Sequence, residues 1–160
     1  MLSSYSVIKT NMASDTFNSF FGRILGDDSI VSTAINLKSD TVKGSLHSSS
    51  WTPSIDDDDH FNDIDNEVSS SGSYTAGIAG GYTLTTSIST DDTDDEGVLD
   101  ATDVSITSAT ITARYFVIRK DTGVSSTSPL VLYIDFGSNV TSTAGTFSIV
   151  FAAEGILNIG

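Results

Sequence analysis

Carboxylates gather in one short stretch of this chain, SIDDDDHFNDIDNE, which runs from Ser54 to Glu67 and holds seven acidic residues. Oxygen ligands at such short spacing are the kind that Ca²⁺ prefers, and His60 lies within the run. Four adjacent carboxylates repel one another, and alternate side chains diverge along an extended chain. The stretch is therefore a cation site, a contact for a basic protein surface, or a solvated loop.

A second acidic segment, DTDDEGVLDATD, resembles a calcium-binding loop in its spacing. Acidic residues fall at positions 1, 3, 5, 9 and 12 of an EF-hand loop, and a glycine falls at position 6. The candidate metal ligands are Asp92, Asp94, Glu96, Asp100 and Asp103. Glu at position 5 and Asp at position 12 depart from the motif, and the flanks are typical of strands. A structural Ca²⁺ and a turn between two strands both fit these letters.

Catalytic chemistry has little support in the sequence. His47 and His60 can each be drawn beside a serine and an aspartate, but serine is so abundant that such a triad carries no information. The chain contains no G-x-S-x-G and no H-E-x-x-H, and its AGIAGG stretch precedes a predicted strand instead of a helix. We therefore expect that the protein is not an enzyme and has no catalytic or cofactor-binding residues.

The first acidic run is predicted to be a surface loop that contacts another protein. Unpaired carboxylates are costly in a dry interior, so this many acids must face water, a cation or a basic surface. Apolar residues flank and interrupt the acids, where they would clip the loop to its own domain or insert into a partner. The predicted contact residues are Trp51, Asp56, Asp57, Asp58, Asp59 and Phe61.

Charge balance and the absence of cysteine narrow the functional classes. The chain has 160 residues, a net charge of −14 and only seven Lys and Arg, which form no stripe. Nucleic-acid binding needs clustered positive charge, so we expect no nucleic-acid partner. No apolar stretch approaches the ~20 residues that span a bilayer, so we expect no membrane partner. The lack of cysteine excludes a disulfide framework and suits assembly in a reducing cytoplasm.

Periodicity predicts one short amphipathic helix near the N-terminus, with Ser14 as its N-cap, Asp15 in its first turn and Gly26 as its stop. The apolar stripe of this helix consists of Phe17, Phe20, Phe21, Ile24 and Leu25. Such a stripe must pack on the rest of the domain or on a neighbouring chain. Residues 1–37 are predicted to form an N-terminal arm with this helix, ahead of a β domain over residues 38–160.

The remainder of the chain is predicted to be β-sheet. Alternating or continuously apolar segments are separated by connections rich in Gly, Ser, Thr and Asp, and the spacing favours antiparallel hairpins. The predicted strands lie within residues 41–47, 81–90, 108–120, 129–137, 145–155 and 155–160. We expect one mainly β domain, an antiparallel β-sandwich or a barrel-like fold with one short N-terminal helix.

The order of several segments resembles a family of small virion-associated proteins of tailed bacteriophages. The similarity rests on SDTVKGSLHSSSWTPSIDDDDHFNDI, SYTAGIAGGYTL, VLDATDVSITSATITARYFVIRKDTG, SPLVLYIDFG and GTFSIVFAAEGILNI. It covers roughly residues 39–160, and its motifs are structural in character instead of catalytic. Residues 1–37 match the family less clearly.

The resemblance implies a structural component of a phage particle that is assembled in the host bacterial cytoplasm and then resides in the virion. The leading expectation is a decoration, or cement, protein on the outer surface of the head, with the major capsid protein or another virion protein as partner. The alternatives are a neck, tail or fibre component and, more distantly, a stand-alone calcium-binding β module. We also expect a cyclic homo-oligomer, with a trimer as the favoured state.

Overall fold

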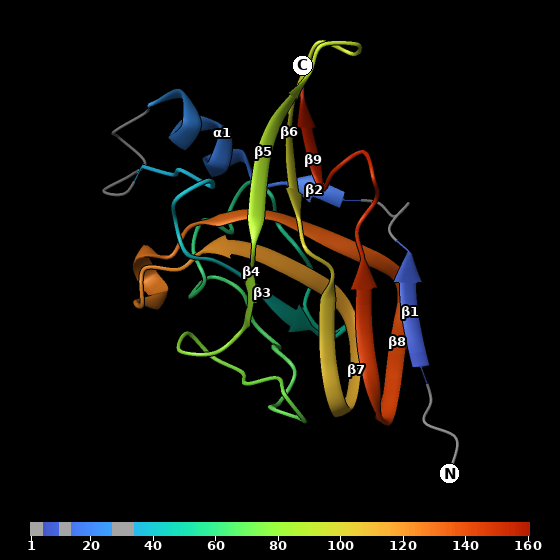
Figure 1. Cartoon of the computed structure of the whole chain (residues 1–160). Helices are drawn as coiled ribbons and strands as arrows, with labels where there is room; N and C mark the ends of the chain where they lie inside the picture. Colours follow the sequence, from blue (N-terminus) through green and yellow to red (C-terminus); the bar gives the residue numbers. More distant parts are fainter. Residues whose placement is uncertain (1–4, 10–13, 27–33) are drawn as a thin grey trace.

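Two long strands form the centre of the fold. β7 (Val104–Lys120) and β8 (Leu130–Val150) pair antiparallel and form a curved hairpin in the computed structural model (Figure 1). The structure describes residues 5–9, 14–26 and 34–160. The register shifts at four places along this pair, and such bulges let a hairpin of this length bend.

Two sheets are built around this hairpin. The six-stranded sheet has the order β1-β8-β7-β3-β4, with β2 also paired to β8; its other strands are β1 (Tyr5–Lys9), β2 (Ser14–Thr16), β3 (Val42–His47) and β4 (Tyr82–Leu84). The three-stranded sheet has the order β5-β6-β9, formed by β5 (Thr86–Asp91), β6 (Glu96–Ala101) and β9 (Leu157–Ile159). All pairs are antiparallel except β1 with β8. The predicted fold class, a mainly β sandwich-like domain with one short helix near the N-terminus, is confirmed.

Side chains alternate between two apolar clusters across the central strands. Phe116 and Ile118 of β7 belong to the larger core, which also includes Leu99 of the three-stranded sheet. Val117 lies on the other face, in a smaller cluster with Trp51. The long segment between β3 and β4 supplies part of that second cover, which explains why the middle of β7 is continuously apolar.

The N-terminal helix begins later than the sequence predicted. Ser14 and Asp15 belong to β2, which pairs with β8, and α1 spans Asn18–Leu25 with Phe17 at its N-cap. Gly26 ends the helix in the left-handed conformation with φ 83°, as predicted. The predicted arm thus contributes two strands to the main sheet; its residues 1–4, 10–13 and 27–33 lie outside the described residues.

Three other boundaries differ from the sequence prediction. The segment 138–144, predicted as a connection, continues β8 without a break. Residues 81–90 were predicted as one strand, but they contain β4 and most of β5. The second acidic segment contains the strand β6, which pairs with β5 on one side and with β9 on the other. In each case strand pairing overrides local composition: residues 138–144 pair with β7, β4 pairs with β3, and β6 pairs with both β5 and β9.

The helix stripe is only partly buried, and this predicts different effects for two neighbouring phenylalanines. Phe20 is 2% exposed and Phe21 is 40% exposed. We expect Phe20→Ser to lower the free energy of unfolding by about 3–5 kcal/mol, and Phe21→Ser by less than about 1 kcal/mol. Urea unfolding of both variants measures this difference. Equal losses, or no loss in either, would contradict the packing of α1 on the domain.

Candidate functional site

The first acidic run is held against the six-stranded sheet by its apolar residues. Trp51, Phe61 and Ile64 are buried in the smaller cluster, where Trp51 meets Tyr115 edge-on with ring centroids 5.3 Å apart. Trp51 also meets Tyr133 with ring centroids 6.0 Å apart. The prediction that Trp51 and Phe61 contact a partner is therefore wrong for their side chains, because the domain's own core takes both of them.

The backbone of the run is also fixed, at the start of β8. The amide of Phe61 donates to the carbonyl of Ser128 at 3.0 Å, and the amide of Leu130 donates to the carbonyl of Asp59 at 3.0 Å. Asp63 accepts hydrogen bonds from the amides of Asp59 and His60, at 3.1 and 2.8 Å. The run is thus a sequence of tight polar turns tied to the sheet.

The four adjacent aspartates occupy different environments. Asp58 is 8% exposed and accepts a hydrogen bond from the amide of Ser54 at 2.9 Å. Burial raises the pKa of Asp58, and the Ser54 amide opposes this shift. Asp56 and Asp57 are exposed, while Asp59 is half-buried. A partner in solution can therefore reach Asp56 and Asp57, whereas Asp58 supports the loop from inside.

Helix α1 lies against the same run. The amide of Asn18 donates to the carbonyl of Ile55 at 3.0 Å, and its side-chain nitrogen donates to Asp56 at 2.5 Å. Arg23, which is 4% exposed, places a guanidinium nitrogen 3.1 Å from Nε2 of His60. Burial lowers the pKa of His60, and the Arg23 charge lowers it further. Arg23 was not among the predicted contact residues, although it is the one cation within the predicted helix.

A second polar cluster fixes the segment that follows the run. The hydroxyl of Tyr74 donates to one oxygen of Glu67 at 2.6 Å, and the amide of Gly77 donates to the other at 2.8 Å. Burial raises the pKa of Tyr74, and the Glu67 charge raises it further. Both carboxylate oxygens of Glu67 are thus engaged in holding residues 74–77 in place.

Arg119 binds the backbone of the AGIAGG stretch, residues 76–81, from the interior of the domain. Its side chain is fully buried, with the guanidinium carbon 4.0 Å from the ring centroid of Phe61 and one nitrogen 3.4 Å from the carbonyl of Gly80. Burial lowers the pKa of Arg119, and Asp121 opposes this shift. Arg119 was not predicted as a buried residue, although the sequence carried a signal for it. It lies two positions after Val117 in β7, so its side chain points to the same face of the sheet, the one covered by the acidic run.

The closest approach to a catalytic pair is sealed inside the domain. The Ser45 hydroxyl oxygen lies 2.9 Å from Nε2 of His47, and Nδ1 of His47 lies 2.7 Å from the carbonyl oxygen of Asp65. Both side chains are fully buried, and the ring of Trp51 lies 5.1 Å from that of His47. A substrate cannot reach this serine, so the pair serves as a satisfied polar contact within the core.

The five predicted calcium ligands do not converge. Residues 92–95 form the turn of the β5–β6 hairpin, in which Asp91 pairs with Glu96. Asp103 follows β6, about 20 Å along an extended chain from Glu96, and accepts a hydrogen bond from the amide of Phe151 at 3.0 Å. No group of three His, Cys, Asp or Glu within the described ranges could hold a metal ion. The EF-hand interpretation is therefore wrong, and the turn between two strands is confirmed.

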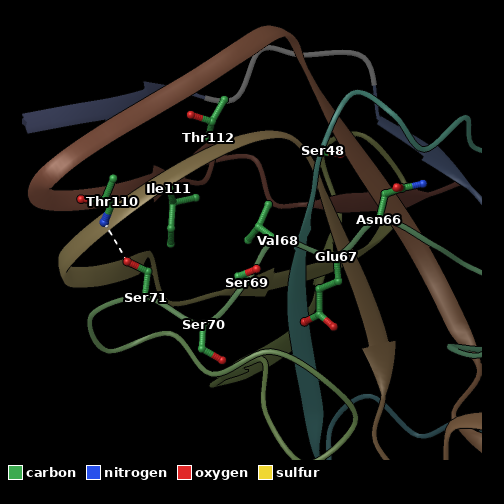
Figure 2. A pocket seen from close by; sticks show the side chains of 10 residues that line it. All are labelled: Ser48, Asn66, Glu67, Val68, Ser69, Ser70, Ser71, Thr110, Ile111 and Thr112. Atoms are coloured by element: carbon green, nitrogen blue, oxygen red, sulfur yellow. Dashed lines mark hydrogen bonds between the residues drawn. The ribbon is translucent and has the colours of Figure 1, made fainter.

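A polar hollow of about 420 Å³ lies between the end of the acidic run and β7 (Figure 2). Hydroxyl groups dominate its lining, and the amide of Thr110 donates to Oγ of Ser71 across it at 2.9 Å. Figure 2 shows the Glu67 carboxylate pointing away from Thr110 and Thr112, and its oxygens are bonded to Tyr74 and Gly77. The hollow supplies no nucleophile with an adjacent base, and we assign no chemistry to it.

Comparison with known proteins provides no relative: no family model, no curated protein and no solved structure matches the chain. Within the described part of the chain, no helix has both the length and the apolar character needed to cross a membrane. The candidate functional feature is therefore the acidic run itself, a rigid loop that presents Asp56 and Asp57 to solvent beside α1.

Proposed function

We propose that this chain is a structural, non-enzymatic protein of a tailed-phage virion, which attaches to the outer surface of the head as a decoration protein. The order of its sequence segments supports this role, because it resembles the phage family described above. The β scaffold encloses Ser45 and His47, so this pair is closed to a substrate. Such an arrangement suits a protein that binds a partner and does not catalyse a reaction. The protein would assemble in the bacterial cytoplasm as a cyclic homo-oligomer, with a trimer favoured.

The observation that carries the proposal is the rigid acidic run. Its backbone is tied to β8 and its aromatic residues lie in the core, so Asp56 and Asp57 are displayed without a large entropy loss on binding. Among the cations whose side chains are described, Arg23 and Arg119 are buried, and Lys43, Arg114 and Lys120 are paired with Asp121, Asp135 and Asp40, which leaves Lys38 as the one exposed cation outside an ion pair. One lysine cannot balance the exposed acids of this chain, so a complementary basic surface must come from another protein. A basic patch on the major capsid protein or another virion protein fits this need.

Particle binding tests this attachment. Purified protein is mixed with particles that lack it, and the bound fraction is measured by sedimentation across a range of salt. We expect Asp56→Asn with Asp57→Asn to weaken binding by about fivefold near 0.1 M salt, as two exposed ion pairs would. Binding of the unmodified protein should also fall toward 1 M salt, where the screening length is about 3 Å.

The matched control removes the same charge elsewhere, through Asp100→Asn with Glu154→Gln, and should bind like the unmodified protein. Equal binding of both double variants at every salt would contradict attachment through the acidic run. A chelator arm separates protein contacts from a metal, because loss of binding with chelator alone would point to an ion. If a map of the particle shows density for the protein at the neck or tail, the proposed position on the head is wrong and the neck or tail is its location.

A further inference from the structure

Exposed apolar side chains gather on one side of the molecule. The described residues include six large hydrophobic side chains that are at least 40% exposed, and Val124 is the one that lies apart. The other five belong to α1 or to the three-stranded sheet, and they are Phe21, Ile24, Leu25, Ile88 and Ile159. Clustered exposure of this kind marks a binding surface, whereas scattered exposure does not.

An apolar groove of about 180 Å³ runs between α1 and this sheet. Phe20 and Ile24 line it from the helix, and Ile88, Leu99 and Leu157 line it from the strands. The three strand residues share one face because Ile88 pairs with Leu99, which pairs in turn with Leu157. Figure 1 shows α1 beside β5, with the β5–β6 hairpin extending beyond the body of the domain.

An acidic hollow continues the groove toward the tip of that hairpin. Its lining includes Asp92 and Asp95 of the hairpin turn, and Gly97 lines both the hollow and the groove. The Glu96 side chain, which accepts a hydrogen bond from Asn158 at 2.8 Å, lies on the opposite face of the sheet. Thr90, which also lines the hollow, pairs with Gly97 and lies two residues from Ile88, so these positions share the face of the groove. Apolar and acidic surface are therefore continuous along one hairpin.

The strand beside the groove has an unpaired edge. β5 is the end strand of its sheet in the described part of the chain, and every residue from Ser87 to Asp91 is exposed. An end strand presents backbone groups that can pair with an added strand, and side chains of that strand then reach the neighbouring surface at alternate positions.

We propose that the groove and the adjoining acidic hollow bind an extended basic segment of another protein, which places large apolar side chains in the groove and Lys or Arg side chains near Asp92 and Asp95. Charge complementarity selects this occupant over a second copy. Among the cations whose side chains are described, Lys38 is the one that is exposed and outside an ion pair, and each copy carries a net charge of −14. Neither Asp56 nor Asp57 lines this site, and its binding chemistry holds whether or not the protein belongs to a virion.

A synthetic peptide of seven residues, Leu-Thr-Leu-Thr-Lys-Thr-Lys, is the probe. It is long enough to lie along β5, and its Leu and Lys side chains project from the same face, as the groove and the adjoining acidic hollow require. Its affinity for the full chain is measured by calorimetry, and its position by shifts of the backbone amide signals in NMR spectra. We expect Ile88→Thr with Ile159→Thr to weaken binding about tenfold, since both changes remove apolar contact area from the groove. Val124→Thr, which makes an exposed apolar side chain outside the groove polar, should leave the affinity unchanged.

The acidic hollow is tested with its own double variant and a matched control variant. Asp92→Asn with Asp95→Asn should weaken binding about fivefold at low salt and little near 1 M salt, whereas Asp56→Asn with Asp57→Asn should not. Asn suits the positive φ of 58° at Asp95, so this variant keeps the turn. Unfolding midpoints establish that each variant is folded.

Three results would overturn the proposal. The same peptide with Ser in place of both Leu residues, if it binds as tightly, would show that charge alone drives the contact. Equal losses in the Val124→Thr variant and in the groove variant would show that the groove is not the binding surface. A change of oligomeric state caused by Ile88→Thr with Ile159→Thr, without any peptide, would show that a second copy covers the groove instead.

Discussion

Replacing Gly44 with alanine should cost about 3 kcal/mol or more of unfolding free energy, one of the largest losses expected for any single methyl group added to this domain. Gly44 lies in the middle of β3, between Tyr82 of β4 and Ile118 of β7. A Cβ at this position would overlap the ring carbons of Phe116. That ring is fully buried and packs near Phe151, so it has no free space into which it can move.

A second strand glycine provides the control. A Cβ at Gly97 would meet its nearest atom, the carbonyl oxygen of Ile159, at 3.7 Å, which is ordinary contact. Gly97→Ala should therefore change the free energy of unfolding by less than about 1 kcal/mol. Adding Phe116→Leu to Gly44→Ala should recover part of the loss, so the two changes are less than additive. Urea midpoints for Gly44→Ala that equal those of the unmodified protein would contradict this packing.

The central strands were predictable because their local pattern agrees with their environment. Continuous apolarity around Phe116 indicates a strand covered on both faces, and the structure places Phe116 and Val117 in two different clusters. Alternation likewise predicted β3 at its observed position, Val42–His47. These patterns depend on which face of a strand is covered, and the sequence carries that information directly.

Other boundaries depend on partners far along the chain. Ser14 and Asp15 have the composition of a helix start, but pairing with β8 at Ile134 and Tyr133 makes them a strand. The stretch 138–144 has the composition of a turn, yet it pairs with β7 between Ile111 and Ala113 and continues the long hairpin. Tertiary pairing determines such segments, and no local rule contains it.

The residues of the candidate sites were likewise predictable only where the local sequence pattern determines their environment. Density of charge predicted that Asp56 to Asp59 face a partner, but only Asp56 and Asp57 of these are exposed, while Asp58 is buried. An aromatic residue beside acids has the same pattern whether it anchors a loop or protrudes. Trp51 was therefore assigned to a partner contact although the core takes it. The groove could not be predicted, because it forms only where α1 meets β9, and these elements are separated by most of the chain.

Lowering the pH from about 7 toward 4 should destabilise the domain through His47. Burial lowers the pKa of His47 to about 4 from an ordinary value of 6.5; the Asp65 carbonyl opposes this shift, and the Arg119 charge adds to it. Between these two pH values the unfolded chain binds a proton at His47 that the folded chain does not bind. Stability is therefore fully present above about pH 6.5 and falls with pH, by about 3 kcal/mol once both states are protonated.

Urea unfolding at several pH values measures this loss, with His47→Gln and His60→Gln as the paired variants. The pKa of His60 is also lowered, but this ring is partly exposed, so His60→Gln should remove less of the pH dependence. His47→Gln should remove most of the slope between pH 4 and 6.5, whatever its effect on stability at pH 7. The NMR signals of the His47 ring give an independent reading, because in the folded protein they should stay constant down to about pH 5. Titration of that ring with a midpoint near 6.5 would contradict a buried neutral histidine beneath Trp51.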